Sequence, residues 1–265
     1  MINNFRHCPK ALTSRIASIA GVFTIACLAL ATSNPAQAGV VISGTRVIYP
    51  ADQKDVSVWF QSKNKRPALV QVWLDDGNEN VAPEKAKVPF IATPPVFRLE
   101  PEKQQVVRLV YTGEALPTNK ESLFWLNMLE VPPKVKDEEA ANQLQLAFRT
   151  RLKVFFRPKD LPYEPTLAPE KLTWDVVEDK QGFALKVSNP SPYYVSFDSV
   201  SLNVAGKRYE KPVGQTSADN MVGPGADSTF ALPSLKSMPG ADAQVEFESI
   251  DDIGAKVSHT SKVSH

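Results

Sequence analysis

The residues that most often perform chemistry, cysteine and histidine, lie at the two ends of this chain. Among its 265 residues are only 2 Cys and 3 His: Cys8, Cys27 and His7 fall within the first 27 positions, and His259 and His265 within the last seven. The sequence between them offers no thiol nucleophile, disulfide, Cys/His metal site or imidazole base. This distribution argues against an enzyme or a metalloprotein, and we expect no cofactor.

Two acidic clusters are the remaining candidates for acid–base chemistry. Asp75, Asp76 and Glu79 form the first cluster, and Asp251 and Asp252 form the second. The Asp-Gly pair within the first cluster is typical of a hairpin turn, and its spacing does not fit a calcium loop. We therefore interpret the first cluster as a hairpin turn and predict no catalytic activity.

The first 38 residues have the organisation of a secretory signal peptide. Arg6, Lys10 and Arg15 precede an apolar run over residues 16–31, and the Ala-Gln-Ala sequence at 36–38 provides a cleavage site. A retained membrane anchor is the alternative, but the run is shorter than the ~20 residues that span a bilayer. We predict export, cleavage after residue 38 and no stable membrane insertion of the mature chain.

The charge balance argues against nucleic-acid binding. The chain has 30 Lys+Arg and 29 Asp+Glu, a formal charge of +1, and loss of the leader removes three cations and no anions, which leaves −2. A nucleic-acid-binding protein would instead carry a surplus of cations. The remaining 227 residues suffice for one large or two ordinary domains, which must fold without disulfides.

The elements that would position any site are strands, with very little helix. Runs of β-branched, aromatic or alternating residues are bounded by Pro, Gly, Asp or Asn, which is typical of strands. In the first half the predicted strands are 40–49, 56–61, 68–74, 96–99, 105–111, 123–131 and 144–156. In the second half they are 174–177, 183–188, 195–204, 228–232 and 244–250.

Seven short strands in about 120 residues indicate a β-sandwich, and the second half repeats the pattern. Three prolines between the halves indicate a stiff linker. We predict an all-β protein with an N-terminal domain at 39–158, a linker at 159–165, a C-terminal domain at 166–255 and a flexible polar tail at 256–265.

The predicted strand at 144–156 is unusually long. Thirteen residues would extend ~43 Å, whereas most strands have ~5–6 residues. One face carries the apolar row Leu144, Leu146, Phe148, Thr150, Leu152, Val154 and Phe156, and the other face carries Arg149, Arg151 and Lys153. An ordinary core strand with a solvated cationic face is one interpretation. A strand whose first half projects beyond the fold is the other, and its apolar edge would self-associate unless another chain paired with it.

Six motifs follow one another along the chain. They are TRVIY at 45–49, TPPVFRL at 93–99, LPTNKESLFWLNMLEVPP at 116–133, RLKVFFRP at 151–158, NPSPYY at 189–194 and IDDIG at 250–254. Together they resemble the PapD-like periplasmic pilus chaperones of chaperone-usher systems, over nearly the whole mature chain. The short segment before residue 144 and the absence of Cys from the flanking strands resemble the short-loop subgroup.

This resemblance implies two immunoglobulin-like β-sandwich domains set at an angle, with a cleft between them. It also implies a periplasmic chaperone that lends its long strand to a fimbrial subunit with an incomplete sandwich and delivers the subunit to an outer-membrane usher. Leu144, Leu146 and Phe148 would be the donated side chains, with Thr150 or Leu152 completing the row.

The resemblance also implies roles for charged residues. Arg46 and Lys153 match the cleft cations that would hold the C-terminal carboxylate of the subunit, although each alone reads as a solvated strand residue. Glu121, Arg157 and Asp252 match a structural ion network between the domains, and Asp251 beside Asp252 leaves that last assignment open.

A secreted or surface adhesin with a carbohydrate-binding module is the alternative function. Tyr193 and Tyr194 could stack on sugars, or they could be core residues of the second domain. An adhesin would remain at the cell surface and bind glycan, whereas a chaperone would co-purify with a fimbrial subunit.

Overall fold

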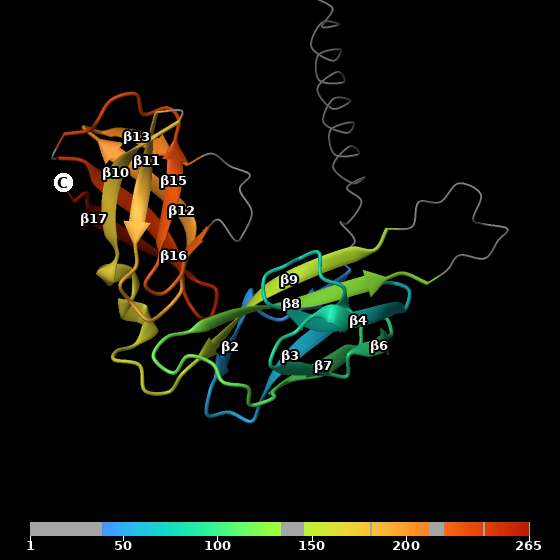
Figure 1. Ribbon diagram of the computed structural model, residues 1–265. Coiled ribbons are helices and arrows are strands. Elements are labelled where there is room, and N and C mark those ends of the chain that lie inside the picture. The colour runs from blue at the N-terminus through green and yellow to red at the C-terminus, as the bar shows by residue number, and fades with distance from the viewer. Residues whose placement is uncertain (1–38, 134–145, 181, 212–219, 241, 265) are drawn as a thin grey trace, which may run out of the picture. The chain divides into compact units, whose positions relative to one another are not determined.

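The computed structural model describes residues 39–133, 146–180, 182–211, 220–240 and 242–264. These residues form two β-sandwiches connected by a short segment with two 3-10 turns, Pro165–Leu167 and Pro169–Lys171 (Figure 1). The predicted all-β, two-sandwich fold is confirmed. No helix in the described part of the chain is long and apolar enough to cross a bilayer. The predicted leader, residues 1–38, lies outside the described residues.

The described residues of the first sandwich form nine strands in two sheets. They are β1 (Val40–Ile42), β2 (Arg46–Pro50), β3 (Asp55–Ser62), β4 (Ala68–Asp75), β5 (Phe90–Thr93), β6 (Val96–Leu99), β7 (Gln104–Tyr111), β8 (Ser122–Val131) and β9 (Phe148–Arg157), with a 3-10 turn at Pro83–Lys85. One sheet has the order β1-β3-β7-β5 and the other β2-β9-β8-β4-β6. Fully buried Tyr49, Phe60, Leu109 and Leu126 lie in the core of this sandwich.

The predicted strand at 40–49 is wrong in one respect, because it is two strands that belong to different sheets. β1 pairs with β3, whereas β2 pairs with β9. Gly44 lies between them with φ +87°, a conformation that costs glycine little and other residues more. This turn carries the chain from one sheet to the other and places Arg46 at the start of β2.

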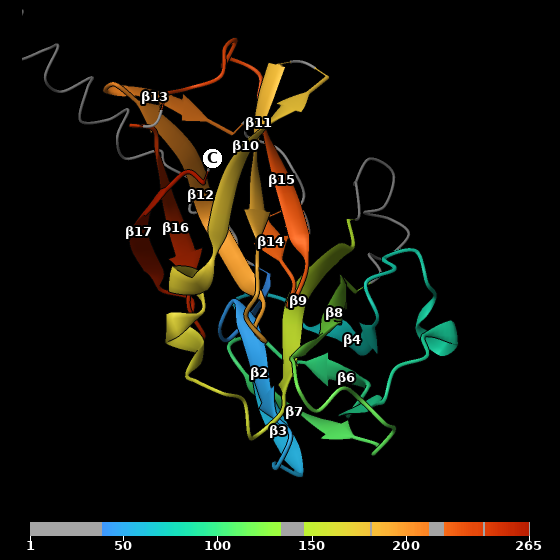
Figure 2. The same cartoon turned by 60° about the vertical axis from the view of Figure 1, so that its left-hand side comes forward.

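In the second sandwich, eight strands lie within the part of the chain that the structure describes. They are β10 (Thr173–Asp179), β11 (Gly182–Ser188), β12 (Val195–Val204), β13 (Lys207–Glu210), β14 (Met221–Val222), β15 (Asp227–Leu232), β16 (Gln244–Ile250) and β17 (Lys256–Lys262). Their sheets have the orders β10-β11-β15 and β13-β12-β16-β17, with β14 paired to β12 (Figure 2). Trp174, Leu185, Leu202 and Phe230 are fully buried between them.

The predicted flexible tail at 256–265 is wrong for the described residues. β17 pairs with β16 from Lys256 to Lys262, and Ser264 bridges to Asp175. The His259 ring stacks on Phe247 at 4.9 Å between centroids. The polar composition of this segment reflects an edge strand with a largely exposed face. The second sandwich therefore extends past residue 255.

Candidate functional site

The site centres on β9, whose two edges have different neighbours. β8 pairs with β9 from Phe148 to Phe156, and the two strands run side by side in Figure 1. β2 pairs in parallel with the other edge, but only from Lys153 to Arg157. Within the described residues, no strand pairs with the second edge of β9 between Phe148 and Leu152. This half of the strand can therefore accept a further strand.

The exposure of the apolar row of β9 also changes near the point where β2 begins to pair. Leu146 and Phe148 are 51% and 60% exposed, and Thr150 is also exposed. Leu152 is 6% exposed and belongs to the core of the sandwich, so its prediction as a donated side chain is wrong. Leu144 lies outside the described residues, and the observed strand begins at Phe148, opposite Glu130 of β8.

Arg46 and Lys153 are register partners on β2 and β9. Arg46 Nη1 donates to the carbonyl of Ile250 at 2.8 Å, and its buried Nε has no partner in the described structure. Lys153 Nζ lies 3.4 Å from Ser196 Oγ and 5.8 Å from the centroid of the Trp125 ring. Neither cation forms an ion pair with any carboxylate of the described residues.

Burial makes this pair of cations electrostatically unusual. Burial, and to a smaller extent the neighbouring charge of Arg46, lowers the pKa of Lys153 to about 8. Burial also lowers the pKa of Arg46, although nearby Asp252, Asp251 and Glu121 oppose this shift. Both cations line a cavity of ≈ 300 Å³. An anion entering it would meet two cations that are poorly hydrated and close together.

Glu121, Arg157 and Asp252 meet in one network. Arg157 Nε donates to Glu121 Oε1 at 2.7 Å, and its two terminal nitrogens donate to Asp252 at 2.6 and 2.8 Å. The other Glu121 oxygen accepts from the Tyr194 amide at 2.8 Å. Burial alone would lower the pKa of Arg157, but the two carboxylates outweigh it and raise that pKa. Asp251 instead accepts backbone N–H groups of its own turn.

Replacing Asp252 with Asn is expected to lower the free energy of unfolding by ~1 kcal/mol, because Arg157 loses a charge-assisted bidentate partner that is only partly screened by water. Urea unfolding measures this change. Glu100→Gln is the matched control, because it breaks an exposed pair with Arg98 and should cost ~0.5 kcal/mol or less. Equal effects of the two variants would contradict the stabilising role of the network.

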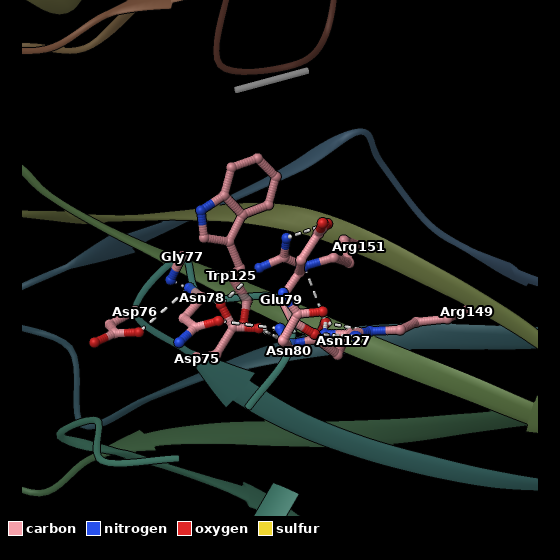
Figure 3. Close-up of polar contacts among 10 residues, drawn as sticks. All are labelled: Asp75, Asp76, Gly77, Asn78, Glu79, Asn80, Trp125, Asn127, Arg149 and Arg151. Carbon is pink, nitrogen blue, oxygen red and sulfur yellow. Dashed lines mark hydrogen bonds and ion pairs between the residues drawn. The ribbon is translucent and has the colours of Figure 1, made fainter. Parts of the chain in front are cut away.

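The acidic cluster at 75–79 does not form the predicted hairpin. β4 pairs with β8 and β6, whereas the next strand, β5, lies in the other sheet. Asp75 is fully buried and accepts from Arg151 Nη2 at 2.6 Å and Asn127 Nδ2 at 2.7 Å (Figure 3). The cationic face of β9 is therefore not simply solvated. Two long cations spaced two residues apart on one strand were the signal that an acidic partner lay nearby.

The two tyrosines offered for sugar stacking are held within the protein. Tyr193 is buried in the second core, and its hydroxyl donates to the carbonyl of Tyr163. The half-buried Tyr194 lies 5.7 Å from the Phe155 ring, between centroids. Among the described residues, the contacts of these side chains are with the protein itself, and none of them favours the adhesin alternative.

Comparison with known proteins gives matches along almost the whole described chain. Residues 39–162 match the family model described as pili and flagellar-assembly chaperone, PapD N-terminal domain, and residues 167–261 match pili assembly chaperone PapD, C-terminal domain. A probable fimbrial chaperone YadV from Escherichia coli K12 is 43% identical over 242 residues, which covers 90% of this chain and 95% of YadV.

Solved structures are similar in the same way. The crystal structure of YadV has a TM-score of 0.72 and 41% identity, and the match covers 85% of this chain and 100% of that one. The structure of Salmonella enterica SafA pilin in complex with the SafB chaperone matches with a TM-score of 0.68 and 30% identity, over 85% of this chain and 96% of that chain.

Proposed function

The chain belongs to the PapD-like family of pilus assembly chaperones and is a periplasmic chaperone of fimbrial assembly, and we propose that it holds a fimbrial subunit by adding the free edge of β9 to it. The subunit would lack one strand of its own sandwich, and β9 would fill that place until assembly. The SafB chaperone, which is similar to this chain, is described in complex with a pilin, and this supports a subunit as the partner.

The free edge of residues 148–152, beside exposed Leu146 and Phe148, is the observation on which the proposal rests. Each backbone hydrogen bond to an added strand would contribute ~1 kcal/mol net, and each large apolar side chain that enters the subunit ~1.5–3 kcal/mol. Thr150 would complete the row of donated side chains. Together these contributions are enough to hold a subunit. A strand from another subunit can still displace β9, one residue pair after another.

Arg46 and Lys153 would bind the C-terminal carboxylate of the subunit. They lie side by side, partly buried and without an ion pair to any carboxylate of the described residues, and charge-assisted hydrogen bonds to a carboxylate would compensate their loss of hydration. Holding the chain end at one point would also set the register of the added strand. A slip by one residue would turn every donated side chain to the wrong face.

The remaining steps of the pathway complete the proposal. Residues 1–38 would direct export and be removed, and the chaperone would deliver its subunit to an outer-membrane usher. Without a subunit, the free β9 edge would allow self-association. The short segment before β9 would place the protein in the short-loop subgroup.

Co-expression with candidate fimbrial subunits, followed by purification from the periplasm, tests the proposal. We expect one subunit per chaperone and an N-terminus at Gly39 by mass spectrometry. Retention of the protein at the cell surface with glycan binding, and no recovered subunit, would instead favour an adhesin.

Complex formation is expected to weaken as the pH rises above about 8. In the free chaperone Lys153 loses its proton in this range, and a neutral amine no longer attracts a carboxylate. A bound anion raises the pKa of Lys153, so above pH 8 the lysine takes up a proton when the subunit binds. The effect is measured as the affinity of the purified chaperone for the co-purified subunit at pH values from 7 to 9.5. Lys153→Arg stays charged and should remove the dependence, whereas a flat wild-type profile would contradict the anchor.

A further inference from the structure

A polar cluster with two buried members extends over β4, β8 and the first half of β9, on the outer face of the sheet. We define the Asp75 cluster as Asp75, Asn127, Arg149 and Arg151 (Figure 3). Asp75 and Asn127 are both 0% exposed. They come from β4 and β8, and the two arginines come from β9. The cluster thus connects three neighbouring strands through side chains.

The two arginines make different contacts within the cluster. Arg151 donates from Nη2 to Asp75 at 2.6 Å and from Nε to Asn127 Oδ1 at 3.1 Å. Arg149 donates from Nε and Nη2 to the same Asn127 oxygen at 2.9 and 2.6 Å, and from Nη1 to the carbonyl of Glu79. Its closest approach to Asp75 is 3.5 Å. Asp75 also accepts from the Gly77 amide at 2.8 Å, so Arg151 is its nearer cation but not its only donor, whereas Asn127 Oδ1 accepts from both arginines.

Tryptophan rings hold the guanidinium groups in place. The guanidinium of Arg149 lies 5.0 Å from the centroid of the Trp73 ring, and that of Arg151 lies 4.7 Å from the centroid of the Trp125 ring. Trp73 is the register partner of Asn127, and Asn127 is the register partner of Arg151. Each arginine thus has one position in which its stacking and hydrogen bonds are all satisfied.

The apolar face of β9 cannot specify its own register completely. A slip of one residue would turn the apolar row outward, but a slip of two residues keeps every side chain on its face. Each residue of the row would move to the place of its neighbour in the row, so that Thr150 would enter the buried place of Leu152. Residues 148–152 are paired along one edge only, by β8, because β2 begins to pair with the other edge at Lys153. Burial of Leu152 opposes the two-residue slip, but the alternation of side chains does not exclude it.

We infer that the Asp75 cluster fixes the register of β9 against β8 and so positions both the donated side chains and Lys153. After a two-residue slip that puts Arg149 opposite Asn127, Ala147 would occupy the place of Arg149. Asp75 and Asn127, which have two arginines in the native register, would then share a single arginine. The slip would also carry Lys153 ~7 Å from Arg46. The effect on subunit binding rests on the proposed strand donation, but the register itself does not.

Two substitutions within the cluster give opposite expectations. In Arg151→Met, Asp75 loses its 2.6 Å partner and retains only Arg149 at 3.5 Å, and a slip of two residues would put Arg149 in the closer place that Arg151 leaves. In Arg149→Met, Arg151 still satisfies Asp75, and a slip would remove that contact. We therefore expect slipped strands in Arg151→Met and native register in Arg149→Met. A cluster that only adds stability would give the two variants the same register.

Disulfide trapping in the free exported chaperone reads the register directly, because residues 39–265 contain no cysteine. Met128 is opposite Thr150 in the native register and would be opposite Phe148 after the slip. With cysteines at 128 and 148, we expect at least tenfold more cross-link in Arg151→Met than in the parent or Arg149→Met. With cysteines at 128 and 150, the cross-link should be strong in the parent and in Arg149→Met and should decrease in Arg151→Met. Cross-linking confined to 128–150 in all three backgrounds would overturn the inference.

Hydrogen exchange provides a second measurement that needs no introduced cysteine. In Arg151→Met the amides of residues 148–152 should lose protection at least tenfold, whereas Asp227→Asn, which breaks an exposed pair with Lys186 in the other sandwich, should leave them unchanged. Unchanged protection in Arg151→Met would also overturn the inference. Neither experiment contains a subunit, so a negative result leaves strand donation intact.

Discussion

Lys153→Met is expected to abolish recovery of subunit complexes while making the free chaperone more stable. A charge-assisted hydrogen bond to the subunit carboxylate is worth ~1.5–3 kcal/mol, so its loss weakens binding by about 10- to 150-fold. Met keeps the apolar stem of the side chain beside Trp125 and removes only the charge. Periplasmic pull-down with a co-expressed subunit measures the first effect.

The gain in stability follows from the lowered pKa of Lys153. The unfolded chain binds this proton more tightly than the folded chain does, so the charged lysine opposes folding at every pH below about 8. This cost disappears as the pH rises from about 8 to 10.5. At pH 7 we expect urea unfolding of Lys153→Met to show a gain of about 1–3 kcal/mol. In wild type, stability should rise with pH across this window, and in Lys153→Met this rise should be absent.

Lys186→Met is the matched control, since this exposed lysine lies on the second sandwich and pairs with Asp227. It should change neither complex recovery nor the urea midpoint of unfolding. Normal complex recovery by Lys153→Met would show that the subunit carboxylate is held elsewhere. A loss of both binding and stability would mean that Lys153 serves the fold instead.

Replacing Leu146 and Phe148 together by Glu should eliminate protection of the subunit without unfolding the chaperone. The two side chains would contribute about 3–6 kcal/mol in the complex, so their loss corresponds to about 10²–10⁴ in affinity, before the cost of burying two carboxylates. Both are mostly exposed in the free protein, so its melting temperature should hardly change. Subunit yield in the periplasm and the melting temperature check both statements.

Ile91→Glu is the control for this double substitution. Ile91 is 55% exposed and lies on β5, in the other sheet of the same sandwich. It carries the same change in chemistry at a similar exposure, and we expect normal subunit yield. If the double variant also gave normal yield, strand donation through β9 would be wrong.

Strands with a simple alternating pattern were predictable to the residue. The ranges expected for β6, β12 and β16 coincide with those observed, because Pro, Gly, Asn or Asp lies close to their ends. β17 was missed because a polar edge strand has little apolar periodicity. The split at Gly44 was missed because a continuous β-type sequence does not reveal which sheet each half joins.

The limits of the site prediction have equally physical causes. Alternation assigns Leu152 and Phe148 to one face, but it does not say where the core ends along that face. Burial of Asp75 depends on strands β8 and β9, which lie far from it in sequence. Arg46, Lys153 and the ion network were expected from family resemblance, since spacing alone does not bring residues 46 and 153 together.

The position where β2 begins limits how far an added strand of a subunit, here called the guest strand, can extend along the free edge of β9. A guest strand that enters beside Phe148 can advance only to Leu152, because β2 already occupies the edge from Lys153 onward. If its chain end stops at Lys153, the guest must run parallel to β9, in line with β2. About five residues, or ~17 Å of strand, then fit between the stop and the start of β9. If Arg46 and Lys153 bind the chain end as proposed, a guest with an extra residue would present a peptide carbonyl there in place of a carboxylate, and the site would select guests by length as well as by sequence.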